Sequence, residues 1–195
     1  MRQVLLATQN PGKIAELQRI LGGQVELVAI GERYVPGPET GATFEDNALA
    51  KAVEGVRATG LPTVADDSGL AVDALNGMPG VLSARWAGRH GNDLANLALL
   101  LAQTTDVPAA RRGAGFVCAA AYALPDGRSG VVRGELRGRL AREPRGSGGF
   151  GYDPVLVPDG LDVTTAELEP VDKDRISHRG KAFRLLAPQL LEALA

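Results

Sequence analysis

Residues 63–72 read T-V-A-D-D-S-G-L-A-V, and the interpretation of the whole chain starts from them. Two short apolar runs, each typical of a strand, flank two carboxylates, a serine and a glycine. Neighbouring side chains of a strand point to opposite faces, so Asp66 and Asp67 reach one ligand together only where the strand ends or bulges. We expect that break at Ser68 and Gly69.

A carboxylate exposed at a strand end is a hard oxygen ligand that is ionised near pH 7, which a magnesium-dependent hydrolase requires. The alternative is a polar turn between two hairpin strands, where Asp, Ser and Gly are ordinary residues. Taken alone, the stretch favours the turn, and the rest of the chain has to decide between the two.

The size and charge of the chain narrow the classes of protein. Its 195 residues suit a single domain over residues 1–195, or one domain in two lobes, and 45% hydrophobic residues suffice for a core. The net charge of −2 gives no bulk attraction to nucleic acid or to an anionic membrane. A single cysteine, Cys118, fits a reduced compartment, and no run resembles a signal peptide or a membrane span. Together with the net charge, these features predict a cytoplasmic protein that binds neither nucleic acid nor membrane.

Helical and strand patterns alternate early in the chain, and antiparallel strand patterns follow. Predicted strands cover residues 4–7, 25–30, 63–65, 70–72, 115–124, 130–140 and 155–157. Predicted helices cover residues 11–21, 43–59, 92–102 and the C-terminal stretch up to 194. This order favours an α/β or α+β sheet protein over a regular doubly wound one.

The segment T-Q-N-P-G-K, residues 8–13, separates the first strand from the first helix. Asn10 is a good N-cap and Pro11 suits the first helical position. The N–H groups of a helix start favour an anion, whereas Lys13 opposes the helix dipole and therefore indicates a ligand. A capped helix start without a ligand is the alternative.

Four polar segments lie at element boundaries. They are Thr8–Lys13, the carboxylates of Glu39 and Asp67, Phe150–Asp153, and Lys173 with Ser177–Arg179. Together they offer a phosphate-binding helix start, metal ligands, an aromatic wall and cationic donors, which suits a nucleotide polyphosphate bound with Mg²⁺. The residues do not favour a cysteine or serine nucleophile, because the cysteine lies in an apolar run and no G-x-S-x-G is present.

Five motifs carry a family resemblance, and they occur in one order along nearly the whole chain. They are T-Q-N-P-G-K at 8–13, E-T-G-A-T-F at 39–44, A-D-D-S-G-L at 65–70, G-G-F-G-Y-D-P at 148–154 and S-H-R-G-K-A at 177–182. The chain resembles the inosine/xanthosine triphosphate pyrophosphatases. This resemblance implies an α/β fold with an elongated mixed central sheet flanked by helices, and two lobes with a cleft between them. It also implies a homodimer that hydrolyses dITP, ITP and XTP to the monophosphate and pyrophosphate with Mg²⁺.

The resemblance also assigns roles to residues. Asp67 is implied as general base, and Glu39 and Asp67 as metal ligands. The implied substrate-binding residues are Thr8, Gln9, Asn10, Pro11, Gly12, Lys13, Ser68, Phe150, Gly151, Tyr152, Asp153, Lys173, His178 and Arg179. One departure is Asp46, where the family commonly has Glu, and we interpret Asp46 as a helix cap. Lys51 is expected to be a solvated lysine.

The base-binding hypothesis concerns the oxygen at C6, which hypoxanthine and xanthine carry where adenine has an amino group. Donors from His178 or Arg179 would satisfy that oxygen and leave adenine badly paired. Taken alone, S-H-R-G also fits a helix N-cap followed by solvated charges. A nucleotide-binding regulatory module and a pyrophosphatase for another nucleotide class are the competing functions; the first would not need Glu39 and Asp67 together.

Overall fold

The computed structural model describes residues 3–21, 23, 25–30 and 34–195, and the statements below concern those residues. The chain forms two compact units. Unit 1 consists of Met1–Asp67, Cys118–Gly134 and His178–Ala195, and unit 2 of Ser68–Val117 and Glu135–Ser177. Three strands have residues in both units: β3 (Thr63–Val72), β4 (Gly113–Ala123) and β5 (Ser129–Leu140).

The strands form one mixed sheet in the order β2-β1-β3-β4-β5-β6. Strand β1 (Gln3–Leu6) pairs in parallel with β2 (Glu26–Ala29) and with β3, whereas β5 pairs antiparallel with β6 (Leu156–Pro158). The predicted α/β class and mixed sheet are confirmed. The two units agree with the two predicted lobes, and the cleft and the single domain stay predictions.

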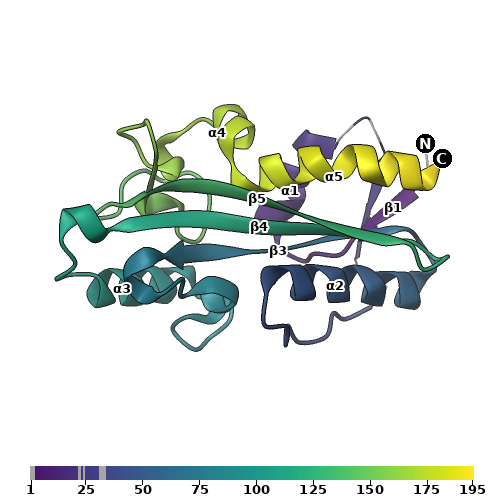
Figure 1. The fold of residues 1–195 in the computed structure, drawn as a ribbon, viewed down its shortest axis with the longest axis horizontal. Helices are drawn as coiled ribbons and strands as arrows, with labels where there is room; N and C mark the ends of the chain where they lie inside the picture. Colours follow the sequence, from purple (N-terminus) through teal and green to yellow (C-terminus); the bar gives the residue numbers. More distant parts are fainter. Residues whose placement is uncertain (1–2, 22, 24, 31–33) are drawn as a thin grey trace. The chain divides into compact units, whose positions relative to one another are not determined.

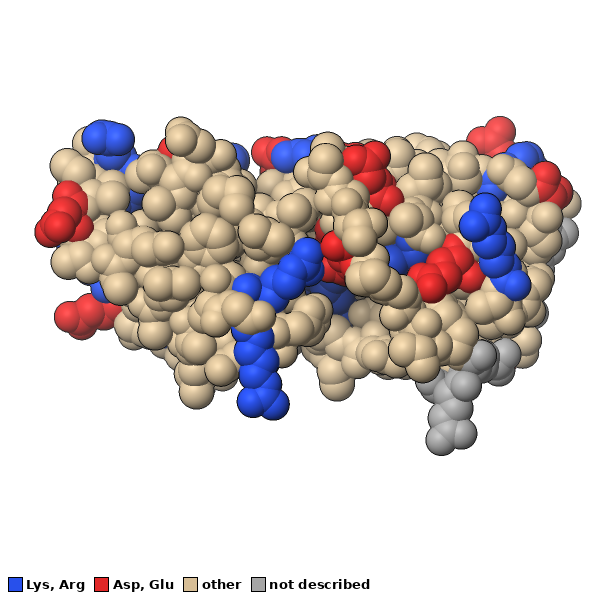
Figure 2. Space-filling view, turned by 90° about the horizontal axis from the view of Figure 1, so that it is seen from below, with Lys and Arg blue, Asp and Glu red and all other residues tan. Residues whose placement is uncertain are grey.

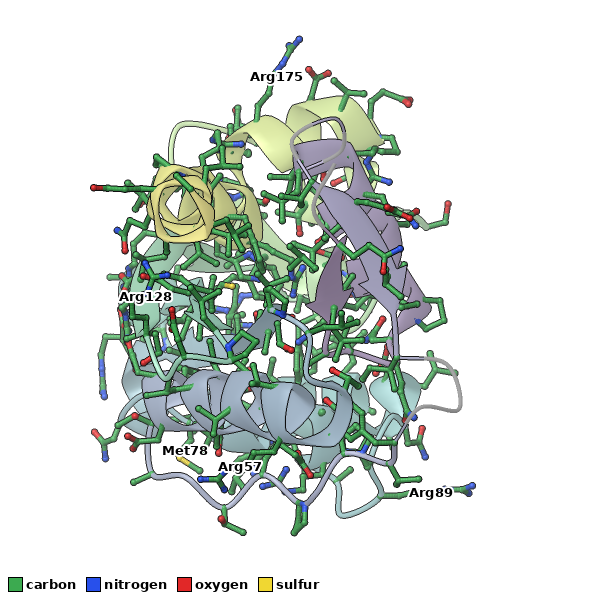
Figure 3. The ribbon with its side chains drawn as sticks, turned by 90° about the vertical axis from the view of Figure 1, so that its right-hand side faces the viewer. Arg57, Met78, Arg89, Arg128 and Arg175 are labelled. Atoms are coloured by element: carbon green, nitrogen blue, oxygen red, sulfur yellow. The ribbon has the colours of Figure 1, made fainter. Side chains whose placement is uncertain are left out.

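Unit 1 is a three-layer structure. Helices α1 (Pro11–Leu21) and α5 (His178–Leu194) pack together on one face of its strands, and α2 (Phe44–Thr59) lies on the other (Figures 1 and 3). Alternation along β1 explains the layers, because Val4 and Leu6 join the core formed with α1 and α5. The intervening Leu5 lies next to Gly55 of α2.

The helix ends follow the local sequence as predicted. The side chain of Asn10 accepts hydrogen bonds from the N–H groups of Gly12 (2.9 Å) and Lys13 (3.3 Å) at the start of α1. Thr43 accepts from the N–H of Asp46 at the start of α2, and Gly60 ends that helix with φ 70°. The side chain of Thr43 therefore caps α2, and a capping role for the side chain of Asp46 stays a prediction.

Unit 2 contains helices α3 (Asp93–Gln103) and α4 (Pro170–Ile176). Its short 3-10 turns are Asp73–Leu75, Gly80–Arg85, Ala109–Arg111, Asp153–Val155 and Thr165–Glu167. The predicted start of α3 is confirmed, because Asn92 caps it. The core of this unit gathers apolar side chains from β3, β4, β5 and β6, among them Leu70, Phe116, Leu136 and Leu156.

The structure of β3 differs from the prediction made from its sequence. It runs unbroken from Thr63 to Val72, so both the predicted break at Ser68 and Gly69 and the alternative hairpin turn are wrong. The strand continues because its two acidic residues find partners on opposite faces. Asp66 pairs with Lys13 of α1, and Asp67 accepts a hydrogen bond from Asn47 of α2.

Two observations concern the surface. Each helix in the described part of the chain is too short or too polar to cross a bilayer. On the face shown in Figure 2, acidic and basic side chains are scattered among uncharged ones, and among the described residues there neither sign forms a continuous patch.

Candidate active site

The two predicted metal ligands, Glu39 and Asp67, both lie near the ammonium group of Lys51 in unit 1. Asp67, on β3, is 4% exposed and accepts a hydrogen bond from Nδ2 of Asn47 (2.9 Å). The Nζ of Lys51, on α2, lies 2.7 Å from Oε1 of Glu39 and 3.9 Å from Oδ1 of Asp67. We call Glu39, Asn47, Lys51 and Asp67 the carboxylate group. The expectation of a solvated Lys51 is wrong, since its side chain is mostly buried in this group.

The surroundings of Asp67 favour its protonated form. Burial raises the pKa of Asp67, and the neighbouring Glu39 raises it further, which together outweigh the attraction of Lys51. For Lys51, burial would lower the pKa, but Asp66, Asp67 and Glu39 hold it above the ordinary value. The group therefore combines a permanent cation with a carboxyl that accepts protons more readily than an ordinary aspartate.

The donor chemistry of the carboxylate group fits Mg²⁺. Glu39 and Asp67 already direct oxygens at one positive charge, and carboxylate oxygens are the ligands that Mg²⁺ takes from proteins. Within the described residues no cluster of three or more His, Cys, Asp or Glu side chains forms a complete protein cage. One or two carboxylates completed by water and substrate phosphates is the usual arrangement for Mg²⁺ at phosphate-processing sites.

A second set of charges in unit 1 is buried, and we call Lys13, Glu16, Asp66 and Arg179 the buried ion network. Asp66 is 1% exposed and lies 2.8 Å from Nζ of Lys13 and 3.3 Å from Nε of Arg179. Arg179 also pairs through Nη1 with Glu16 of α1. Burial alone would raise the pKa of Asp66, but Lys13 and Arg179 outweigh it and hold that pKa far below its usual range. The network fixes the first turn of α5 against α1.

The network changes the interpretation of the helix start at residues 8–13. Two of its N–H groups, which we expected to bind an anion, donate to the side chain of Asn10, and the N–H of Asn10 donates to Oγ1 of Thr8. Lys13, whose position suggested a ligand, has Asp66 as a partner within the chain. Gln9 and Pro11 are exposed, and Gly12 is half-buried.

The glycine-rich segment of unit 2 is organised by Asp153. Its Oδ2 accepts from the N–H of Phe150 (2.8 Å) and from Nζ of Lys173 (2.7 Å), and its Oδ1 accepts from Oγ1 of Thr165 (2.8 Å). The same Nζ lies 5.2 Å from the centre of the Phe150 ring. A Cβ at Gly149 would collide with Oδ2 of Asp153, which explains the glycine. We call Phe150, Asp153 and Lys173 the phenylalanine group.

The two residues between Phe150 and Asp153 have structural contacts. The N–H of Gly151 donates to Asp93 of α3 (2.9 Å), and the hydroxyl of Tyr152 donates to the carbonyl of Ser83 (2.9 Å). Burial raises the pKa of Tyr152 well above its ordinary value, so this hydroxyl remains a donor. Tyr152 thus anchors the segment inside unit 2.

The predicted site residues fall into two sets. Unit 1 contains Thr8–Lys13, Glu39, Asp67, His178 and Arg179, and unit 2 contains Ser68, Phe150–Asp153 and Lys173. Ser68 directly follows Asp67 in β3 and is half-buried, and His178 is buried at the start of α5.

Sequence reasoning missed Glu16 and Asn47 and misjudged Lys51. Glu16 follows Lys13 by three residues, a spacing that places both on one helix face and that we could have used. Asn47 and Lys51 are four residues apart in α2, a spacing that likewise places both on one helix face.

Comparison with known proteins agrees with this description. Residues 4–189 match the model of the Ham1 family. A protein of Nocardia farcinica named dITP/XTP pyrophosphatase is 61% identical over 97% of this chain and 95% of its own length. The crystal structure of a nucleoside-triphosphatase / dITP/XTP pyrophosphatase from Mycobacterium abscessus has a TM-score of 0.79 and 60% identity, covering 95% of this chain and 99% of that one.

A HAM1 protein from Coxiella burnetii is also similar, with a TM-score of 0.88 and 40% identity over 98% of this chain and 100% of that one. The resemblance seen in the five sequence motifs is confirmed. The family model matches almost the whole length of the chain, and the Nocardia farcinica relative is 61% identical to it. The chain therefore belongs to the Ham1 family.

Proposed function

We propose that this chain hydrolyses non-standard purine nucleoside triphosphates, namely dITP, ITP and XTP, to the monophosphate and pyrophosphate. The observation that carries the proposal is the carboxylate group, in which Glu39 and Asp67 converge on one cation. The printed names of the relatives from Nocardia farcinica and Mycobacterium abscessus support the substrate class.

Glu39 and Asp67 would hold Mg²⁺ together with the substrate phosphates. The ion, when bound, offsets negative charge on the phosphate oxygens.

Asp67 would act as general base. A water molecule attacks the α-phosphorus, Asp67 accepts its proton, and the bond to the bridging oxygen breaks so that pyrophosphate leaves. The raised pKa of Asp67 supports this role, because a base is most effective when its pKa approaches the working pH. Lys51 would keep Glu39 and Asp67 close despite their like charges.

The remaining assignments concern the substrate. Residues 8–13 and Ser68 would bind the phosphates, with Lys13 as the cationic group. The phenylalanine group would bind the base, where the Phe150 ring offers a stacking surface. His178 and Arg179 would contribute to selection of the C6 oxygen. The homodimer and the cytoplasmic location implied by the resemblance are part of the same proposal.

A panel of nucleoside triphosphates tests the proposal. Purified protein is assayed for pyrophosphate release from dITP, ITP, XTP, ATP, GTP and dTTP, with Mg²⁺ and with Mg²⁺ removed by a chelator. We expect release from the first three, dependent on Mg²⁺. Binding of ITP without release of pyrophosphate would instead support the regulatory module, and preference for dTTP would support the other nucleotide class. Light scattering after size-exclusion chromatography tests the homodimer.

A further inference from the structure

Asn47 connects two parts of unit 1 that the proposed function needs together. It is the fourth residue of α2 and is 2% exposed. Its Oδ1 accepts from the N–H of Gly41 (2.7 Å), and its Nδ2 donates to Oδ2 of Asp67 (2.9 Å). One side chain therefore contacts both the segment that carries Glu39 and the strand that carries Asp67.

The segment with Glu39 is fastened to α2 at three points. The N–H of Gly37 donates to Oε1 of Glu54 (2.9 Å), Glu39 pairs with Lys51 (2.7 Å), and Gly41 donates to Asn47. The three helix residues are spaced by four and three positions, so they lie along one stripe of α2. The segment contributes every second residue, as an extended chain beside a helix would. Within this row, Asn47 donates a hydrogen bond to Asp67 of β3, and Lys51 lies near the other oxygen of the same carboxylate.

The orientation of the Asn47 amide follows from its partners. The backbone N–H of Gly41 requires an acceptor, so the amide oxygen must face Gly41, and the NH₂ group is thereby directed at Asp67. A donor and an acceptor at this spacing are available from Asn but not from Asp, Ser or Ala. The fit to a single residue type is evidence for a specific role.

We propose that Asn47 is a positioning residue. It fixes residues 37–41 relative to Asp67, so that the carboxylates of Glu39 and Asp67 both face the ammonium group of Lys51. The inference rests on the proposed function and deepens it. In this role Asn47 acts through its hydrogen bonds to Asp67 and Gly41. The bond to Asn47 occupies Oδ2 of Asp67, while Oδ1 is the oxygen on the side of Lys51.

Unit 2 supplies a matched control. Asn96 is the fourth residue of α3, is 1% exposed, and also makes one contact with each end of its amide. Its Oδ1 accepts from the N–H of Ala87 (2.7 Å), and its Nδ2 donates to the carbonyl of Ala84 (3.2 Å). Both of its partners are backbone groups and neither carboxylate is involved. Asn96→Ala therefore has the structural cost of losing a buried amide without the proposed effect on the carboxylate group.

The experiment compares Asn47→Ala, Asn47→Asp and Asn96→Ala with the wild type. Four quantities are measured: kcat and KM for ITP, the melting temperature, calorimetric binding of Mn²⁺ without nucleotide, and hydrogen exchange of the peptide covering residues 37–41. We expect both alanine variants to melt earlier, but only Asn47→Ala to lose ~10–100-fold in kcat and in Mn²⁺ affinity, the usual effect of removing a group that orients a metal ligand.

Asn47→Asp separates the two contacts of the side chain. It keeps an acceptor for Gly41 but places a carboxylate against Asp67. We expect exchange of residues 37–41 to stay slow, as in the wild type, while kcat falls as in Asn47→Ala. In Asn47→Ala the same peptide should exchange faster. Asp is nearly isosteric with Asn, so this variant also covers the case in which Asn47→Ala does not fold.

Two results would overturn the inference. One is a folded Asn47→Ala whose kcat and Mn²⁺ affinity match those of Asn96→Ala. The other is an Asn47→Asp variant with wild-type kcat. Failure of the proposed function gives a different pattern, because the wild type itself would then release no pyrophosphate from ITP. The Mn²⁺ and hydrogen-exchange measurements do not depend on turnover, and they would still decide whether Asn47 holds the two carboxylates together.

Discussion

Asp66 and Asp67 are neighbours in β3 with opposite electrostatic surroundings. Asp66 faces Lys13 and Arg179, which hold its pKa far below the ordinary value, whereas burial and Glu39 raise the pKa of Asp67. The strand alternation that the sequence predicted produces this difference, because each carboxylate meets the helices of a different layer. The ion pairs of Asp66 favour its ionised form, and the raised pKa of Asp67 agrees with the role of general base proposed for it.

Asp67→Asn should lower turnover by ~10²-fold or more, because the amide cannot accept the proton of water. The melting temperature at pH 7 should stay the same or rise. The folded-state pKa of Asp67 lies above the unfolded one, so ionisation at neutral pH costs stability that the neutral amide does not lose. Pyrophosphate release and thermal unfolding measure the two effects. A folded variant with near-normal turnover would remove Asp67 from the role of base.

Lys13→Ala should weaken triphosphate binding and also destabilise the protein. Its position at a helix N-terminus by itself predicts the opposite effect on stability, since a cation there opposes the dipole. The 2.8 Å contact with the buried Asp66 is the larger effect, because its loss removes one of the cations that compensate this carboxylate. We expect a loss of about 1–3 kcal/mol in the free energy of unfolding.

Lys181→Ala, at an exposed position of α5, is the matched control for Lys13→Ala and should change stability little. Chemical denaturation of both variants measures the difference. Equal stability of the two would show that the contact between Lys13 and Asp66 is not a stabilising one.

At the scale of elements, α2 packs tightly on the sheet at Gly55. A Cβ there would lie 2.6 Å from Cγ2 of Thr63 and 3.1 Å from Cδ2 of Leu5. Gly55 thus allows α2 to approach β1 and β3, and it sets the distance at which the side chains of α2 reach Asp67. Gly55 has a helical backbone conformation that other residues can also adopt. The lack of space for a side chain therefore explains the glycine.

Gly55→Ala should destabilise the protein although Ala is the better helix former by about 1 kcal/mol. The methyl group has no room beside Thr63, and overpacking of a core costs about 1–3 kcal/mol. Arg57→Ala is the control, because Arg57 lies on the outer side of the same helix (Figure 3). Chemical denaturation measures both. An increase in the stability of Gly55→Ala would mean that α2 shifts at little cost.

The elements also show which features the sequence could predict. The cap at Asn10 and the helix starts near Thr43 and Asn92 were predicted because a cap bonds to residues two or three positions away. The break in β3 was wrong because the partners of Asp66 and Asp67 come from distant helices. The spacing of Asn47 and Lys51 placed both on one helix face, but it could not identify Asp67 as the partner of Asn47, because that contact spans 20 residues.

At the scale of the whole molecule, the two units share β3, β4 and β5, so the chain passes between them within strands. The motifs carry the family resemblance from which the site residues were inferred, and those assignments stay predictions. The motifs did not predict the ion pairs, such as the one between Asp66 and Arg179, which lie 113 residues apart in the sequence. Pairs of this kind depend on the packed fold and have no local sequence signal.

The global stability should fall as the pH drops below about 4. The folded pKa of Asp66 is depressed, so its contribution is fully present above the unfolded value of about 3.9 and is lost as the pH falls below it. Asp66→Asn should be less stable at pH 7 and should show a smaller loss between pH 5 and pH 2. Urea denaturation across this range measures both slopes. Parallel curves would show that other carboxylates cause the acid sensitivity.

The row of contacts between residues 37–41 and α2 also has a consequence for changes in chain length. Surface segments usually accept an extra residue at little cost. Here every second residue is fastened to the helix, so one inserted residue would turn Glu39 away from Lys51 and bring an exposed neighbour, Pro38 or Thr40, to face α2 instead. Substitutions at these two exposed positions should be tolerated far better than any insertion or deletion. We therefore expect related sequences to differ at positions 38 and 40 and to keep the number of residues in this segment constant.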